Sequence, residues 1–184
     1  DFDGVIKESV EIKSDAFEEL FFQFGEGIAT KVKRHHEENG GMSRFDKFPI
    51  YLGWAEQSQT QKNIDIYAEK FSLLVKKKVM NSEWVVGVLD YLKNNYKRQQ
   101  FFLVTATPQK EIEDIISSLK IKNLFKEIIG SPTKKRDALQ KIMVEFSIKP
   151  EESIMVGDST SDHEAAVLNK VPFILRKTNL NKDL

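Results

Sequence analysis

Four aspartates form two closely spaced pairs that stand far apart in the sequence. Asp1 and Asp3 open the chain, and Asp158 and Asp162 follow the apolar residues 154–156. Carboxylates brought close together repel one another unless a hard cation neutralises them, and their oxygens are ligands that Mg²⁺ prefers. If the fold unites the two pairs, these acids predict a magnesium site.

A hydroxyl and a pair of cations occupy comparable positions. Thr105 follows the apolar run 101–104, and Lys134 and Lys135 follow Gly-Ser-Pro at 130–132. Taken singly, each of these polar residues also suits a turn, a helix cap or a solvated helix start. Because these residues and the aspartates all come just after expected strands, we expect them to lie together at one edge of the sheet.

The second half of the sequence predicts the sheet that would carry this edge. From residue 100 onward, short apolar runs alternate with segments of helical spacing: strands at 101–104, 127–129, 153–156 and 171–175, and helices at 112–119, 139–146 and 162–168. This alternation is typical of an α/β fold with a doubly wound parallel sheet, which binds ligands beyond the carboxyl ends of its strands.

The region before that sheet has a different pattern. From residue 15 to residue 96 the apolar residues recur at helical spacing, as at Phe17, Leu20, Phe21 and Phe24. We therefore expect two parts: a catalytic core made of residues 1–14 and 97–184, and an inserted α-helical cap made of residues 15–96.

The composition excludes several classes of protein. The 184 residues include 28 basic and 28 acidic side chains and no cysteine, so disulfides, thiolate catalysis and cysteine-based metal sites are excluded. The balanced charge does not favour nucleic-acid binding, and no apolar stretch approaches the ~18 residues of a membrane helix. We expect a cytoplasmic monomer that binds neither nucleic acid nor membrane.

The motifs, taken in order, resemble those of the haloacid dehalogenase-like hydrolases, in the branch of phosphoglycolate phosphatases and β-phosphoglucomutase. The matching segments are Asp-Phe-Asp-Gly-Val-Ile at 1–6, Leu-Val-Thr-Ala-Thr-Pro at 103–108, a downstream lysine, and Met-Val-Gly-Asp-Ser-Thr-Ser-Asp at 155–162. The branch also inserts a helical cap between its first and second motifs, so the resemblance covers the whole chain.

The resemblance implies a role for each core residue. Asp1 would be the nucleophile that forms an aspartyl-phosphate, and Asp3 the acid and base, with nearby negative charge helping it to hold a proton. Thr105 and the backbone at Ala106 would bind phosphoryl oxygens, and Lys135, preferred to its neighbour Lys134 by the family's spacing, would neutralise the nucleophile.

The same resemblance implies the metal ligands and a requirement for upstream sequence. Mg²⁺ would be held by the Asp1 carboxylate, the Asp3 main-chain oxygen and Asp158, with Asp162 completing or orienting the shell. Because the nucleophile of this fold ends a central strand, we expect about five apolar residues before Asp1 in the native chain.

The implied function is a Mg²⁺-dependent phosphatase acting on a small phosphorylated metabolite, a phosphosugar or phospho-acid. A phosphomutase of the β-phosphoglucomutase type uses the same core residues, but it commonly has a histidine where this chain has Lys13, which favours the phosphatase and makes Lys13 a candidate for substrate binding. A catalytically silent binding protein is the third alternative, against which the presence of Asp1, Asp3 and the lysine argues.

Substrate selection would reside in the cap. Residues 31–36, followed by Arg44 and Lys47, concentrate cations in a stretch that should lie over the acidic site. The same residues also fit two solvated helix faces, which is the structural interpretation. The functional interpretation is that Arg34, His36, Arg44 or Lys47 binds a carboxylate or hydroxyls of the leaving group.

Overall fold

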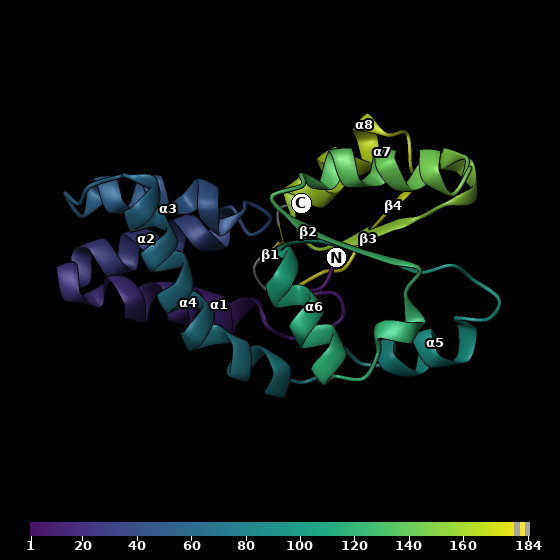
Figure 1. The fold of residues 1–184 in the computed structure, drawn as a ribbon, viewed down its shortest axis with the longest axis horizontal. Coiled ribbons are helices and arrows are strands. Elements are labelled where there is room, and N and C mark those ends of the chain that lie inside the picture. The colour runs from purple at the N-terminus through teal and green to yellow at the C-terminus, as the bar shows by residue number, and fades with distance from the viewer. Residues whose placement is uncertain (179–180, 183–184) are drawn as a thin grey trace.

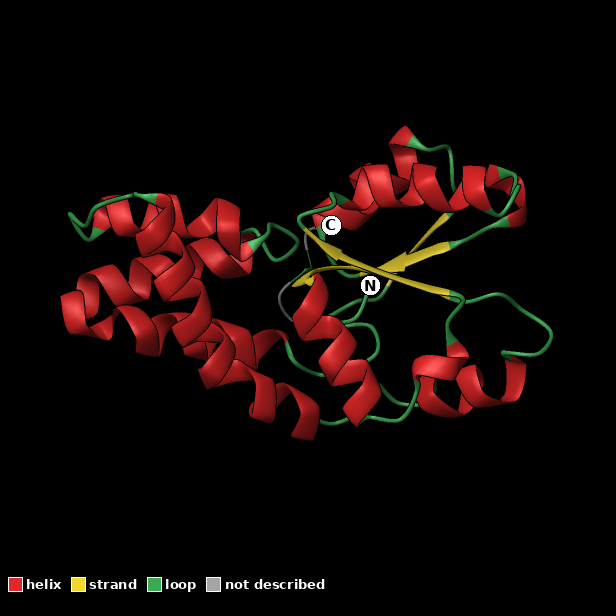
Figure 2. Ribbon diagram, in the orientation of Figure 1, coloured by secondary structure: helices red, strands yellow, loops and turns green. Residues whose placement is uncertain are grey.

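The computed structural model describes residues 1–178 and 181–182. Its strands form two parallel pairs, and helices lie on both sides of them, as in an α/β doubly wound fold (Figure 1, Figure 2). In one pair β1 (Phe102–Pro108) lies beside β2 (Glu127–Ser131), and in the other β3 (Met155–Gly157) lies beside β4 (Phe173–Leu175). The predicted order of strands and helices is confirmed.

The helices that follow the strands shield these pairs. Helix α6 (Gln109–Ser118) lies on one side, and α7 (Lys135–Glu145) and α8 (Thr160–Leu168) lie on the other (Figure 1). The main chain of Asp1 lies beside β3, where its nitrogen donates a hydrogen bond to the Val156 carbonyl at 2.9 Å. The start of the chain is thereby placed at the carboxyl ends of the strands.

Four helices make a separate group at the left of Figure 1: α1 (Val10–Phe21), α2 (Glu26–Glu38), α3 (Arg44–Trp54) and α4 (Gln61–Asn81). We call them the cap. Aromatic side chains fill their interior, including Phe17, Phe21, Phe48, Tyr51 and Phe71. Burial of such large apolar groups is the main stabilisation of a helical group of this size.

The structure divides the predicted cap range differently from the sequence pattern. Helix α1 is continuous through residues 14 and 15, so the expected boundary falls inside it. Helix α5 (Val88–Asn95) lies on the far side of α6 from the cap (Figure 1). Across the described residues, no helix is both long enough and apolar enough to cross a bilayer.

Candidate active site

The carboxyl ends of the strands and the cap enclose a cavity of about 340 Å³. The core contributes residues from all three of its acidic and hydroxyl motifs to the lining, namely Asp1, Asp3, Thr105, Ala106 and Asp158, and the cap contributes Lys13, Phe17, His36, Arg44 and Lys47. Residues more than 150 positions apart in the sequence therefore share one site, as the motif order predicted.

Asp1 is held at both carboxylate oxygens. Its Oδ1 accepts a hydrogen bond from the Phe2 backbone at 2.7 Å, and its Oδ2 accepts one from Lys135 Nζ at 2.7 Å. Lys135, the first residue of α7, is buried and also donates to Asp162 Oδ1 at 2.7 Å, whereas Lys134 is exposed. Of the two adjacent lysines, the structure brings Lys135 to the site.

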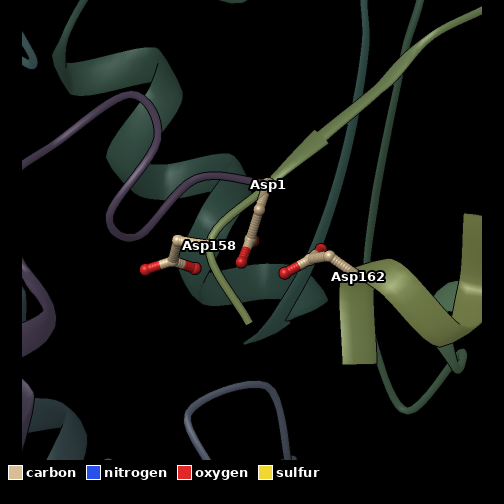
Figure 3. Close-up of side chains that lie close together, drawn as sticks. All are labelled: Asp1, Asp158 and Asp162. Atoms are coloured by element: carbon tan, nitrogen blue, oxygen red, sulfur yellow. The ribbon is translucent and has the colours of Figure 1, made fainter. Parts of the chain in front are cut away.

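Three carboxylates, those of Asp1, Asp158 and Asp162, converge from different segments, and one oxygen of each lies within 4.8 Å of the others (Figure 3). Burial raises the pKa of Asp158 to about 6, and the negative charge of Asp162 adds to this effect. Burial also acts to raise the pKa of Asp162, but Lys135 outweighs it and lowers that pKa. The acidic cluster thus lacks positive charge at Asp158, which a hard divalent cation would supply.

The Asp3 carboxylate lies outside that cluster. It accepts hydrogen bonds from Ser9 Oγ at 2.6 Å and from Thr107 Oγ1 at 3.2 Å, and it forms an ion pair with Lys13. Burial acts to raise the pKa of Asp3, but Lys13 and the hydrogen bonds outweigh burial and lower it. The nearest charged partner of Asp3 is therefore a cation and not another carboxylate.

Ser9 and Thr107 are site residues that the motif reading missed. Thr107 follows Thr105 by two positions on β1, so the two side chains share one face of the strand. That spacing was a usable signal. Ser9, by contrast, precedes α1 and carries no signature that separates it from an ordinary helix start.

Glycines at three positions, Gly4, Gly40 and Gly41, let the backbone approach neighbouring segments at the site. Gly4 has φ +71°, and a Cβ atom there would lie 1.9 Å from Asp158 Oδ2, so a side chain at this position would displace a carboxylate of the acidic cluster. In the cap loop, a Cβ atom at Gly40 would lie 4.0 Å from Ser159 Cβ, whereas one at Gly41 would collide with Ser161. The cap loop therefore rests on the segment that follows β3.

The cap cations that the sequence analysis selected lie in different environments. His36 and Lys47 are buried and line the cavity, whereas Arg34 is exposed on α2 and lies outside the lining. The expectation that Arg34 faces the substrate is wrong for this structure, because residues two apart on a helix point about 200° apart and His36 takes the inward position.

Arg44 lines the cavity but is already paired. Its NH1 and NH2 atoms donate to the two carboxylate oxygens of Glu111 at 2.9 and 2.6 Å, and NH1 also donates to Ser72 Oγ at 2.6 Å. Glu111 belongs to α6 of the core, so this buried ion pair joins the cap to the core. The structure therefore assigns the Arg44 guanidinium to a structural bridge, which replaces the expected substrate contact.

The fold recurs in solved structures. A haloacid dehalogenase-like family hydrolase from Streptococcus pneumoniae superposes with a TM-score of 0.68 at 18% identity, covering 94% of this chain and 80% of that one. A predicted phosphatase from Clostridium acetobutylicum gives a TM-score of 0.73 at 18% identity, covering 100% of this chain and 87% of that one. At such identities the likeness concerns the fold alone.

Sequence comparison adds the family. A phosphoglycolate phosphatase from Pseudomonas putida is 30% identical over 181 residues, which cover 90% of this chain and 63% of the relative. The chain thus spans less than two thirds of that relative's length. The family described as "Haloacid dehalogenase-like hydrolase" matches residues 1–175. With nearly the whole described chain inside that match, the chain belongs to the haloacid dehalogenase-like hydrolases.

Proposed function

We propose that this chain carries the active site of a Mg²⁺-dependent phosphatase that hydrolyses a small phosphorylated metabolite, a phosphosugar or phospho-acid. The observation that carries the proposal is the setting of Asp1. Its carboxylate lines the cavity while the buried Lys135 ammonium holds one oxygen in place at 2.7 Å. Such a carboxylate is ion-paired and oriented, as suits a nucleophile. The name of the Pseudomonas putida relative supports a phosphomonoester as substrate.

In the first step, an Asp1 oxygen attacks phosphorus, a new phosphorus–oxygen bond forms and the bond to the leaving oxygen breaks. The products are an aspartyl-phosphate on Asp1 and the alcohol of the leaving group. In the second step, water attacks the aspartyl-phosphate, releases inorganic phosphate and regenerates the Asp1 carboxylate. Lys135 stabilises the charge on Asp1 before and after transfer.

Asp3 would move the protons of both steps. In the first it gives a proton to the leaving oxygen, and in the second it takes one from the attacking water. Its lowered pKa favours the second role, and the first requires that Asp3 gain a proton as the phosphoryl group, itself negative, enters beside it. The hydroxyls of Ser9 and Thr107 orient its carboxylate toward the cavity.

Thr105 and the backbone nitrogen of Ala106 would bind the phosphoryl oxygens from the end of β1. The donor set of Asp1, Asp158 and Asp162, with the Asp3 main-chain oxygen, fits Mg²⁺, since it offers oxygen atoms only and its acids are short of positive charge. When bound, Mg²⁺ supplies positive charge beside the phosphoryl group.

The test is phosphate release from a panel of phosphosugars, phospho-acids and an aryl phosphate. We expect Mg²⁺ to support hydrolysis and excess chelator to abolish it, and Asp158→Asn to raise the Mg²⁺ concentration needed for half-maximal rate by at least about tenfold. Undiminished hydrolysis in chelator contradicts the proposed metal role. No hydrolysis of any panel member with Mg²⁺ present contradicts the phosphatase.

A further inference from the structure

Asn181 is a buried amide in the segment that follows β4. Only 7% of the residue is exposed, and it lines the cavity from the core. Its Nδ2 atom donates hydrogen bonds to the Asp158 carbonyl at 2.7 Å and to the Arg176 carbonyl at 2.8 Å. Its Oδ1 atom accepts a hydrogen bond from the Thr178 nitrogen at 2.7 Å. Both hydrogens of the amide nitrogen are thus directed at main-chain oxygens.

These hydrogen bonds continue the pairing of β3 with β4 beyond the ends of the strands. The ladder ends at the Gly157–Leu175 pair, where the Arg176 nitrogen donates to the Gly157 carbonyl at 2.8 Å. The next carbonyl along the chain is that of Asp158, and among residues 1–178 and 181–182 no backbone nitrogen donates to it. The Asn181 side chain supplies the donor that this main-chain oxygen would otherwise lack.

The carboxylate of Asp158 depends on its backbone for its position. Asp1 and Asp162 are each held by the Lys135 ammonium, whereas no cation of the described chain forms an ion pair with Asp158. A Cβ atom at Gly4 would lie 1.9 Å from Asp158 Oδ2, so this carboxylate occupies the space directly beside the Gly4 backbone. The main chain at position 158 therefore directs the carboxylate into the acidic cluster (Figure 3).

We infer that Asn181 is a positioning residue, which holds the main-chain oxygen of Asp158 and thereby keeps the Asp158 carboxylate in place for Mg²⁺. This inference rests on the proposed function, in which Asp158 is a metal ligand. Replacing a residue that bonds to a metal ligand typically costs about 10–100-fold in metal affinity or activity. The alternative is a purely structural amide that only shapes the segment after β4.

The experiment compares Asn181→Leu with Asn169→Leu in the full chain. Leu has nearly the shape and volume of Asn but donates no hydrogen bond from its side chain. Asn169 follows α8 and also donates to two main-chain oxygens, those of Arg136 at 3.0 Å and Ala165 at 2.9 Å, but it does not line the cavity. Isothermal titration calorimetry measures Mg²⁺ binding, hydrolysis of an aryl phosphate at increasing Mg²⁺ gives kcat, and thermal melts measure stability.

We expect Asn181→Leu to raise the Mg²⁺ dissociation constant at least about tenfold and Asn169→Leu to leave it within about twofold of the native value. At saturating Mg²⁺ the kcat of Asn181→Leu should stay within about threefold of native, because metal binding selects the correct position of Asp158. Both variants should lose a similar amount of thermal stability, since each leaves two main-chain oxygens without a donor.

Two results would overturn the inference directly. The first is an unchanged Mg²⁺ dissociation constant in folded Asn181→Leu, and the second is an equal rise in both variants, which would reflect a general loosening of the core. A fall in kcat that saturating Mg²⁺ does not restore would also overturn it, because Asn181 would then act on a catalytic group. Should Asn181→Leu fail to fold, Asn181→Ala takes its place in the same comparison.

The same measurements separate this inference from the proposed function. Mg²⁺ binding by the native protein without hydrolysis of any phosphomonoester would refute the phosphatase, and calorimetry would still decide the role of Asn181. No Mg²⁺ binding by the native protein would refute the metal site and this inference together.

Discussion

At the scale of single residues, the properties of the site depend on which cation each aspartate contacts. Asp1 and Asp162 share the Lys135 ammonium, Asp3 is paired with Lys13, and Asp158 has neither partner. An aspartate is thus ion-paired and oriented at position 1 and short of positive charge at position 158. Such differences between identical groups assign their chemical roles.

Asp1→Asn should lower phosphate release by more than about 1,000-fold, because the amide that replaces the carboxylate is not a nucleophile. The side chain keeps its volume, so the melting temperature should stay within a few degrees of the native value. Steady-state assays and circular dichroism melts measure both. Near-native turnover by a folded Asp1→Asn variant would exclude a covalent intermediate on Asp1.

Lys135→Met should lower kcat by at least about 100-fold, since Asp1 loses the cation that holds its Oδ2 atom at 2.7 Å. Lys134→Met is the matched control, because this neighbouring lysine is exposed, and its kcat should stay within about twofold. Steady-state kinetics of the two variants side by side make the comparison. If both variants lost activity equally, the assignment of Lys135 to the site would fail.

At the scale of elements, one buried ion pair fixes α3 of the cap to α6 of the core. The Arg44–Glu111 pair has only 4% and 7% of its side chains exposed, and Ser72 of α4 adds a hydrogen bond to it. On the surface, between α4 and the same helix α6, the Lys76–Asp114 pair is 38% and 47% exposed. Buried and exposed pairs at one junction allow a direct comparison.

Arg44→Met should destabilise the protein by about 3–5 kcal/mol, because it leaves the Glu111 carboxylate buried without a counter-charge. Lys76→Met should lower the free energy of unfolding by no more than about 1 kcal/mol. Urea unfolding of both variants measures these values. Comparable losses for the two would show that the buried pair contributes no more than a surface contact.

The same pair predicts a pH dependence. Burial acts to raise the pKa of Glu111, but Arg44 outweighs it and the pKa is lowered. The stabilising contribution is therefore complete above the unfolded-state pKa of about 4.3 and is lost as pH falls through the lower folded-state pKa. Without Arg44, burial raises the Glu111 pKa instead, so the stability difference between native protein and Arg44→Met should narrow as pH falls below about 5. A difference independent of pH would contradict this assignment.

The sequence predicted the secondary-structure elements better than it predicted which side chains contact one another. Apolar runs and motif order located the strands, the helices after them and the core residues of the site, since these depend on local spacing. The Arg44–Glu111 contact joins residues 67 positions apart, and no local pattern encodes such a pair. The sequence left both Arg34 and His36 as candidates, although residues two apart on a helix point about 200° apart and cannot both face one cavity.

At the scale of the whole molecule, the cavity exists only because the cap lies against the core. The cap supplies Lys13, His36 and Lys47, and the core supplies the acids and Thr105, so neither part alone makes the site. The close packing of the Gly40–Gly41 loop against the segment after β3 closes one side of this arrangement. The Arg44–Glu111 pair lies at the same junction.

Because Gly40 lies close to Ser159, an engineered disulfide there could control the contact between the cap loop and the core. A Cβ atom at Gly40 would lie 4.0 Å from Ser159 Cβ, within the range that a disulfide spans, and the chain has no native cysteine to compete. In a Gly40→Cys/Ser159→Cys variant, oxidation should tether the cap loop to the core, slow turnover at least about tenfold by hindering substrate exchange, and be reversed by a thiol reductant. Assays of the oxidised and reduced forms measure this directly, and full turnover by the oxidised form would mean that catalysis proceeds without separation of the two surfaces.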